Sequence, residues 1–175
     1  MSRLATVNVV KTFTFDAAHF LPNYDGKCGK LHGHTYTLIT CFVGQVGGDR
    51  CMVADFGAIK DLVQEVVLDN LDHSCLNDVN WEIYPDPGED FTSEVWELSQ
   101  PTAENMVVAI AERLKAALTL PGHAEAFEGV HLRQVTLFET PTSYASWIAE
   151  DQVELALRLA EGATTFFIDD PEEDN

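Results

Sequence analysis

The chain has 175 residues, 46% of them hydrophobic, which suits one domain with a substantial core. Asp and Glu total 29 against 10 Lys and Arg, so the formal net charge is −19. This charge argues against nucleic acid and anionic membrane surfaces as partners, although a few local cations are enough to bind a small anionic substrate. No stretch has the pattern of a secretory signal or a membrane span, so we expect a cytoplasmic protein with reduced cysteines.

The first half of the chain begins with two predicted strands. Residues 6–15 and 32–46 are rich in β-branched and aromatic types, and a loop rich in Pro, Asn, Asp and Gly separates them at 21–31. The turn Gly47-Gly48-Asp49 predicts a hairpin to a short strand at 51–54.

Two helices and two further strands are predicted next. Asp55 is a predicted N-cap, followed by apolar residues at helical spacing to Val66. Thr102 is the predicted cap of a second helix, which ends at Pro121-Gly122. Residues 131–139 and 144–149 are predicted strands. The order ββααββ predicts an α+β fold, with an antiparallel sheet and both helices on one face.

Three segments fit this pattern less simply. Residues 79–100 form a long irregular connection, of a length that is often functional or mobile. Residues 151–160 alternate apolar and polar types as a strand does, but consist of strong helix formers, and we predict a helix there. Residues 169–175 read as a disordered acidic end.

The segment from Cys28 to His34 carries the strongest chemical signal. His32 and His34 are two residues apart on a predicted strand, so they point to one face. His19 lies just past the end of the neighbouring predicted strand, where pairing would bring it beside His32. Three histidines with an open fourth position are typical of a catalytic zinc site, although iron and nickel also accept imidazole ligands.

Four other positions have both a chemical and a structural interpretation. Cys28 is either a small packing residue or a thiolate, and the flanking Lys27 and Lys30 favour the thiolate. Asp72 and His73 follow a helix end, where turn chemistry explains them slightly better than a shared site. Glu139 ends an apolar strand face, as a solvated strand end or as a carboxylate that anchors paired N–H donors of a ligand.

Six stretches of the chain combine into one larger pattern. They are Phe13-Thr-Phe-Asp-Ala-Ala-His19, Cys28-x-x-x-His32-Gly-His34, Val53-Ala-Asp-Phe56, Leu71-Asp-His73 with Leu76-Asn-Asp78, Pro101-Thr-Ala-Glu-Asn105 and Glu139-Thr140. Together they resemble the family of 6-pyruvoyl-tetrahydropterin and 6-carboxytetrahydropterin synthases. The resemblance implies the tunnelling fold, whose subunits assemble into β-barrels, commonly hexamers made of two trimers, with active sites between subunits. It divides the chain into a synthase domain at 1–150 and a C-terminal extension with an acidic tail at 151–175.

The resemblance also implies roles for the site residues. It implies a zinc ion held by His19, His32 and His34, and a proton-abstracting thiolate at Cys28. His73 with Asp72 behind it would form a proton relay, and Glu139 would anchor the pterin ring through its N–H groups. We add the weaker inference that Lys27 and Lys30 meet the charge of a triphosphate.

The three-residue gap between Cys28 and His32 resembles the carboxy-forming branch. That branch converts 7,8-dihydroneopterin triphosphate to 6-carboxy-5,6,7,8-tetrahydropterin, acetaldehyde and triphosphate, on the route to queuosine. Pyruvoyl-forming relatives usually have a longer gap and are the first alternative. The second is a non-catalytic pterin-binding paralogue, because the long connection at 79–100 and the C-terminal tail depart from the usual pattern and would suit a partner.

Overall fold

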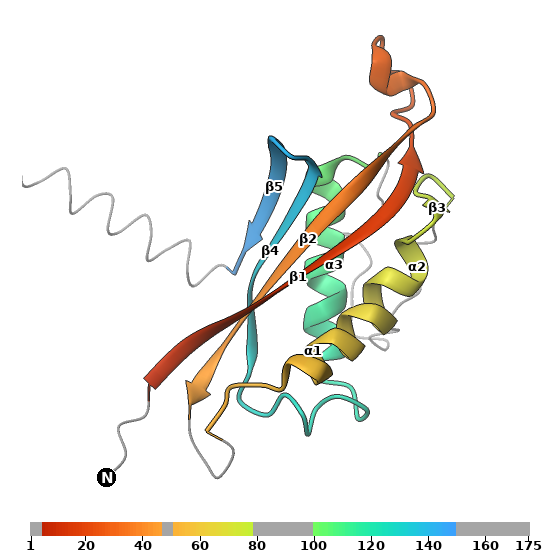
Figure 1. Ribbon diagram of the computed structural model, residues 1–175. Helices are drawn as coiled ribbons and strands as arrows, with labels where there is room; N and C mark the ends of the chain where they lie inside the picture. The colour runs from red at the N-terminus through yellow and green to blue at the C-terminus, as the bar shows by residue number, and fades with distance from the viewer. Residues whose placement is uncertain (1–4, 47–50, 79–99, 150–175) are drawn as a thin grey trace, which may run out of the picture.

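The computed structural model describes residues 5–46, 51–78 and 100–149, which form one sheet covered by helices (Figure 1). The elements in chain order are β1 (Ala5–His19), η1 (Lys27–Gly29), β2 (His32–Val46), α1 (Phe56–Val63), η2 (Gln64–Leu68), α2 (Asp69–Leu71), β3 (Ser74–Cys75), α3 (Ala103–Ala117), β4 (His131–Thr140) and β5 (Ser143–Ile148). The predicted α+β class and ββααββ order are confirmed, with the two-residue strand β3 added between the helices.

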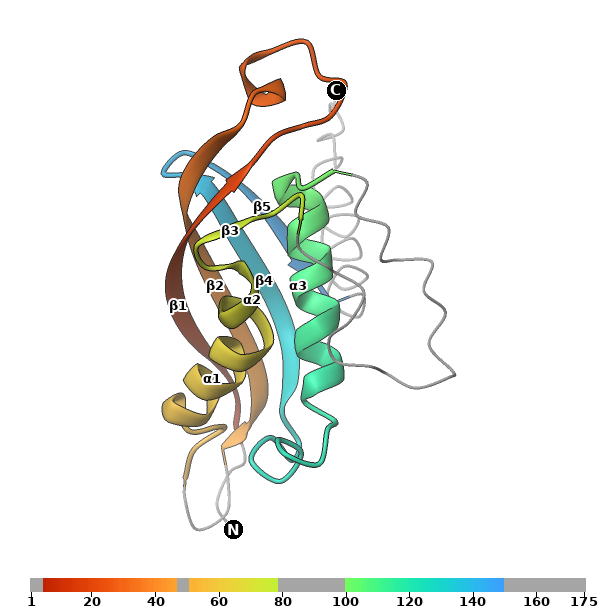
Figure 2. The same cartoon turned by 90° about the vertical axis from the view of Figure 1, so that its right-hand side faces the viewer.

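The sheet has the strand order β3-β1-β2-β4-β5. The pairs β1–β2, β2–β4 and β4–β5 are antiparallel, as predicted, and β3 pairs with β1 in parallel. Figures 1 and 2 show α1, α2 and α3 on the same face of this sheet. The buried side chains of α1 and α3 pack there against alternate residues of β1, β2 and β4, so the core lies between the helices and the sheet.

Strand β1 is longer than predicted. It continues to His19, which pairs directly with His32 instead of lying beyond the strand end. The side chain of Asn77 explains the extension, because it accepts a hydrogen bond from the backbone N–H of Phe20 and donates one to its carbonyl, both at 2.9 Å. This amide substitutes for a strand partner at the end of β1 and holds the backbone next to His19.

Both helices begin at the predicted caps. The carboxylate of Asp55 accepts from the N–H of Gly57, and the hydroxyl of Thr102 accepts from the N–H of Asn105. The first helix passes into a π-helical turn at Gln64–Leu68, a local widening that often occurs near functional sites. It ends at Leu71, directly before Asp72 and His73.

The predicted strand at 51–54 is wrong. Only Met52 forms an isolated bridge, and Cys51 has a φ of 50°, in the left-handed region that a strand excludes. The chain therefore turns here into the cap of α1. The predictions for residues 79–99 and 151–175 lie outside the described residues. Within the described ranges, no helix has the length and hydropathy needed to cross a membrane.

Candidate metal centre

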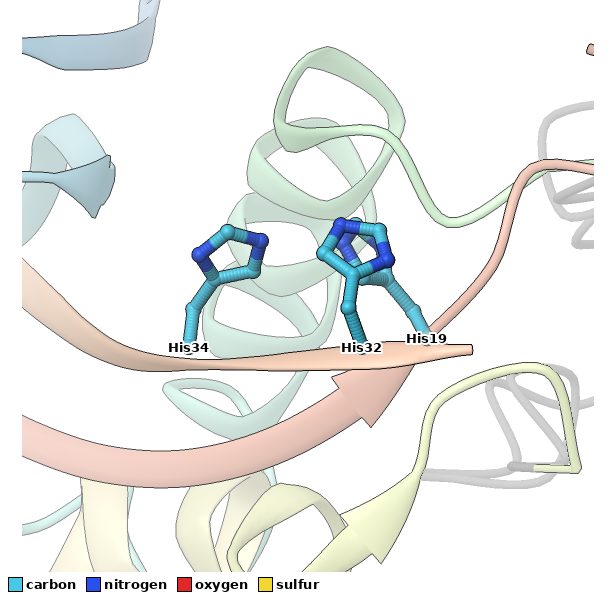
Figure 3. Close-up of side chains that lie close together, drawn as sticks. All are labelled: His19, His32 and His34. Atoms are coloured by element: carbon cyan, nitrogen blue, oxygen red, sulfur yellow. The ribbon is translucent and has the colours of Figure 1, made fainter. Parts of the chain in front are cut away.

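Three imidazoles converge at one end of the β1–β2 pair, and we call His19, His32 and His34 the histidine cluster. His19 and His32 are direct cross-strand partners, and His34 follows two residues along β2 on the same face. Figure 3 shows the three rings rising from this face, with α3 behind them. One nitrogen from each ring lies within 4.8 Å of the others, so the cluster has the dimensions to hold one metal ion.

Backbone carbonyls orient two of these rings. His19 Nδ1 lies 2.8 Å from the carbonyl oxygen of Pro101, and His32 Nδ1 lies 2.7 Å from that of Lys30. A carbonyl only accepts hydrogen bonds, so each Nδ1 carries the proton and each Nε2 keeps its lone pair. Histidine ligands of metals are commonly fixed in this way by a hydrogen bond from the other ring nitrogen.

The buried nitrogens of the cluster fit a cation. His19 is 2% exposed, and Nε2 of His19 and Nε2 of His34 have no hydrogen-bond partner among the described residues. A buried polar atom without a partner is costly, which a metal bond would relieve. Burial lowers the pKa of His34 against the opposing charge of Glu139, and so favours the neutral imidazole that binds metal.

Glu139 joins the histidine cluster from β4. Its Oε1 lies 3.4 Å from Nε2 of His19 and 3.8 Å from Nε2 of His34. The carboxylate is partly exposed, at 29%, and faces the histidines across the sheet. It lies on the same face of the sheet as Leu137 and Val135, as the alternation along β4 predicts.

Cys28 lies near the cluster along the chain but in a different kind of structure. It belongs to η1 in the loop between β1 and β2, and its side chain is partly buried. Its carbonyl accepts a 2.8 Å hydrogen bond from the N–H of Leu21, which ties the loop to the residues after His19. Lys27 and Lys30 flank Cys28 as exposed residues.

Asp72 and His73 form a pair at the edge of β1. Oδ1 of Asp72 lies 2.9 Å from Nδ1 of His73 and accepts a 3.0 Å hydrogen bond from the N–H of Asp16. His73 has a φ of 59° and a side chain that is 79% exposed. The Asp72 carboxylate thus connects the His73 ring to the backbone of β1. This contact is not local turn chemistry, in which Asp72 would bond only its own neighbouring backbone. His73 and His34 both line an open hollow of about 440 Å³, together with residues of β1, the start of β2 and β3.

The residues that position the cluster were visible in the sequence as a cap and a motif, but their role beside His19 was not predicted. Thr102 caps α3, and Asn105 donates a 2.9 Å hydrogen bond to the carbonyl of Gln100. These contacts fix the turn that presents the Pro101 carbonyl to His19. The motif Pro101-Thr-Ala-Glu-Asn105 was visible in the sequence, but its position beside His19, 82 residues away, was not.

Tyr36 was also missed. It follows His32 and His34 on the same face of β2, and its ring stacks on Phe15 at a centroid distance of 5.0 Å. Its hydroxyl is buried and has no partner among the described residues. Burial and, to a lesser degree, the charge of Glu139 raise the pKa of Tyr36, so the hydroxyl stays protonated.

Comparisons with a family model, with curated proteins and with solved structures all point to the same family. A family model described as 6-pyruvoyl tetrahydropterin synthase matches residues 8–150. A 6-carboxy-5,6,7,8-tetrahydropterin synthase from Haemophilus influenzae is 34% identical over 146 residues, covering 79% of this chain and 96% of the relative. One from Bacillus subtilis is 34% identical over 136 residues, covering 77% and 80%. The solved structure of Caenorhabditis elegans 6-pyruvoyl tetrahydropterin synthase matches with a TM-score of 0.64 and 26% identity, over 86% of this chain and all of that one. The chain belongs to the 6-pyruvoyl tetrahydropterin synthase family.

Proposed function

We propose that this protein is a zinc-dependent pterin synthase, a carbon–oxygen lyase that converts 7,8-dihydroneopterin triphosphate to 6-carboxy-5,6,7,8-tetrahydropterin, acetaldehyde and triphosphate. The convergence of the three imidazoles carries this proposal, since it provides a metal site in a member of a pterin-processing family. The names of the relatives from Haemophilus influenzae and Bacillus subtilis support the carboxy product.

His19, His32 and His34 would hold the ion as neutral ligands. Zinc supplies Lewis acidity, which stabilises negative charge on the oxygens of a substrate side chain. The carbonyls of Pro101 and Lys30 keep the rings of His19 and His32 in the ligating tautomer. Both acceptors are main-chain atoms, so these contacts orient the two rings without help from the substrate.

Proton transfer is assigned to Cys28 and His73. The C–H bonds of the substrate side chain are weak acids, and a thiolate near the metal is a suitable base for them. His73 would move protons to and from that thiol near neutral pH, with Asp72 holding its Nδ1 so that Nε2 is free for transfer. Lys27 and Lys30 would meet the triphosphate, and their exposure leaves both ammonium groups accessible to it.

The exposed position of His73 supports a homo-oligomer. A relay residue that is 79% exposed in one chain would gain a water-excluding environment where a second subunit covers it. We infer a hexamer of two trimers, in which neighbouring subunits complete each site and Glu139 binds the pterin N–H groups. Native mass spectrometry tests the hexamer, and a monomer with full activity would contradict it.

One assay tests the reaction. The purified protein is incubated with 7,8-dihydroneopterin triphosphate, the products are identified by mass spectrometry, and zinc is measured on the same sample. We expect acetaldehyde and the 6-carboxy product, both abolished by Cys28→Ala with zinc still bound. A pyruvoyl product without acetaldehyde would favour the pyruvoyl synthase, the activity named for the Caenorhabditis elegans structure. Zinc-replete protein that binds pterin without turnover would favour the non-catalytic paralogue.

A further inference from the structure

The carboxylate of Glu139 stands beside the histidine cluster without being hydrogen-bonded to it. Its Oε1 is 3.4 Å from Nε2 of His19 and 3.8 Å from Nε2 of His34, whereas N–H···O hydrogen bonds measure about 2.7–3.2 Å. Both nitrogens lack a hydrogen-bond partner among the described residues. The carboxylate and the two imidazoles therefore face a common point that none of them occupies.

The shorter of these two separations matches that between two ligands of one ion. Zinc–nitrogen and zinc–carboxylate bonds are about 2.0–2.2 Å long, so two ligand atoms at a tetrahedral angle lie about 3.3–3.5 Å apart. The two distances from Oε1 of Glu139 are 3.4 Å and 3.8 Å. Glu139 thus lies at a distance from His19 and His34 that suits a further ligand of an ion bound by these two histidines.

The backbone around Glu139 departs from regular strand pairing, although its side chain keeps the face of Leu137. In the β4–β5 ladder Phe138 pairs with Tyr144 and Thr140 pairs with Ser143, and the register shifts between Phe138 and Thr140. Glu139 is therefore the residue left unpaired at a β-bulge. Bulges are common next to active sites, and this one leaves the backbone of Glu139 outside the β4–β5 ladder.

We propose that Glu139 is the fourth metal ligand of the substrate-free protein, and that it leaves the metal when it binds the N–H groups of the pterin. The second half of this statement rests on the proposed function. A single carboxylate cannot occupy both positions, so the metal would gain an open coordination position only after the pterin ring is bound. By linkage, binding of pterin would weaken the bond between Glu139 and the metal, and that bond would weaken pterin binding by the same factor.

Metal affinity in the absence of substrate tests the first half. Zinc affinity is measured by chelator competition for the wild type, Glu139→Gln, Glu139→Asp and the control Asp16→Asn. Asp16 lies on β1 three residues before His19 and on the opposite face, so its substitution removes a nearby charge and leaves the residues of the histidine cluster unchanged. Melting of the metal-free proteins shows that each variant is folded.

We expect Glu139→Gln to weaken zinc binding by at least about tenfold and Asp16→Asn to leave it within about twofold. Glu139→Asp keeps the charge but withdraws the oxygen by one methylene, and should weaken binding almost as much as Glu139→Gln. Unchanged affinity in Glu139→Gln overturns ligation. Unchanged affinity in Glu139→Asp beside a weakened Glu139→Gln also overturns it, because charge alone would then account for the effect.

Cobalt absorption tests the second half. Unsubstituted pterin added to the Co²⁺-loaded wild type should change the visible spectrum as one ligand departs, and should not change that of Glu139→Gln. An unchanged wild-type spectrum at saturating pterin overturns the exchange. The proposed reaction and the proposed metal ligand can fail separately. If Glu139→Gln binds zinc more weakly but the wild type does not turn over the substrate, only the proposed reaction is removed. Conversely, if the wild type turns over substrate fully while Glu139→Gln binds zinc as tightly as the wild type does, only the proposal that Glu139 is a metal ligand is removed.

Discussion

Gly29, the residue after Cys28, provides a sharp test of the role assigned to the thiol. A Cβ at this position would lie 2.2 Å from the carbonyl oxygen of Tyr24. Carbon–oxygen contacts in proteins begin at about 3.3 Å, so Gly29→Ala creates an overlap of about 1 Å. Because the obstructing atom belongs to the main chain, the backbone next to Cys28 must move by a comparable amount.

A displacement of about 1 Å in a reacting group costs about 100-fold in rate. We therefore expect kcat/KM of Gly29→Ala to fall about 100-fold in the 7,8-dihydroneopterin triphosphate assay. Zinc content should stay close to the wild-type level, because all three histidines belong to β1 and β2 and the loop contributes only the Lys30 carbonyl that orients His32. Steady-state kinetics and metal analysis on the same samples provide both measurements.

The matched control is Gly122→Ala, where an added Cβ meets nothing within 4 Å. It should keep both activity and zinc. Folded, zinc-loaded Gly29→Ala with wild-type kcat/KM would refute the reasoning, since it would show that the position of the Cys28 loop does not limit catalysis. Loss of zinc in Gly29→Ala would instead show that the loop and the histidine cluster are one structural unit.

Three further predictions concern stability. Thr102→Ala removes the hydroxyl that accepts from the N–H of Asn105 and should lower the free energy of unfolding by about 1 kcal/mol in urea titrations. Thr102→Ser keeps a hydroxyl and should retain most of that stability. Equal losses of stability in the two variants would contradict the cap. Tyr36→Phe deletes a buried hydroxyl without a described partner, so the free energy of unfolding should be unchanged or rise by up to about 1 kcal/mol, and a clear loss would reveal a partner. The N–H of Asp16, followed by the contacts with His73, lowers the pKa of Asp72 below its ordinary value of 3.8. This carboxylate therefore stabilises the fold above that pH and loses its contribution as the pH falls through the folded pKa. Asp72→Asn should consequently make the loss of stability on acidification less steep. Identical acid-unfolding curves for the wild type and Asp72→Asn would argue against the interaction.

Part of the site could be predicted because it depends on local periodicity. His32 and His34 share a face for the same reason that any residues i and i+2 of a strand do, and Glu139 shares the face of Leu137. The helix caps at Asp55 and Thr102 were predictable because capping depends on residue types within one turn.

Other features depend on contacts between distant segments. Asn77 extends β1 to His19, and the Pro101 carbonyl orients the His19 ring; both partners are separated from their targets by more than 50 residues. The strand expected at 51–54 failed for a local reason, since the left-handed conformation of Cys51 has no clear signal in residue type.

The sequence by itself determined which residues are candidates for the chemistry, because residue type, strand alternation and motif order are properties of the chain. Only the tertiary structure decided how they combine. It placed Glu139 among the histidines and kept Asp72 and His73 at the other edge of β1, because cross-strand register and packing set distances that spacing along the chain does not contain.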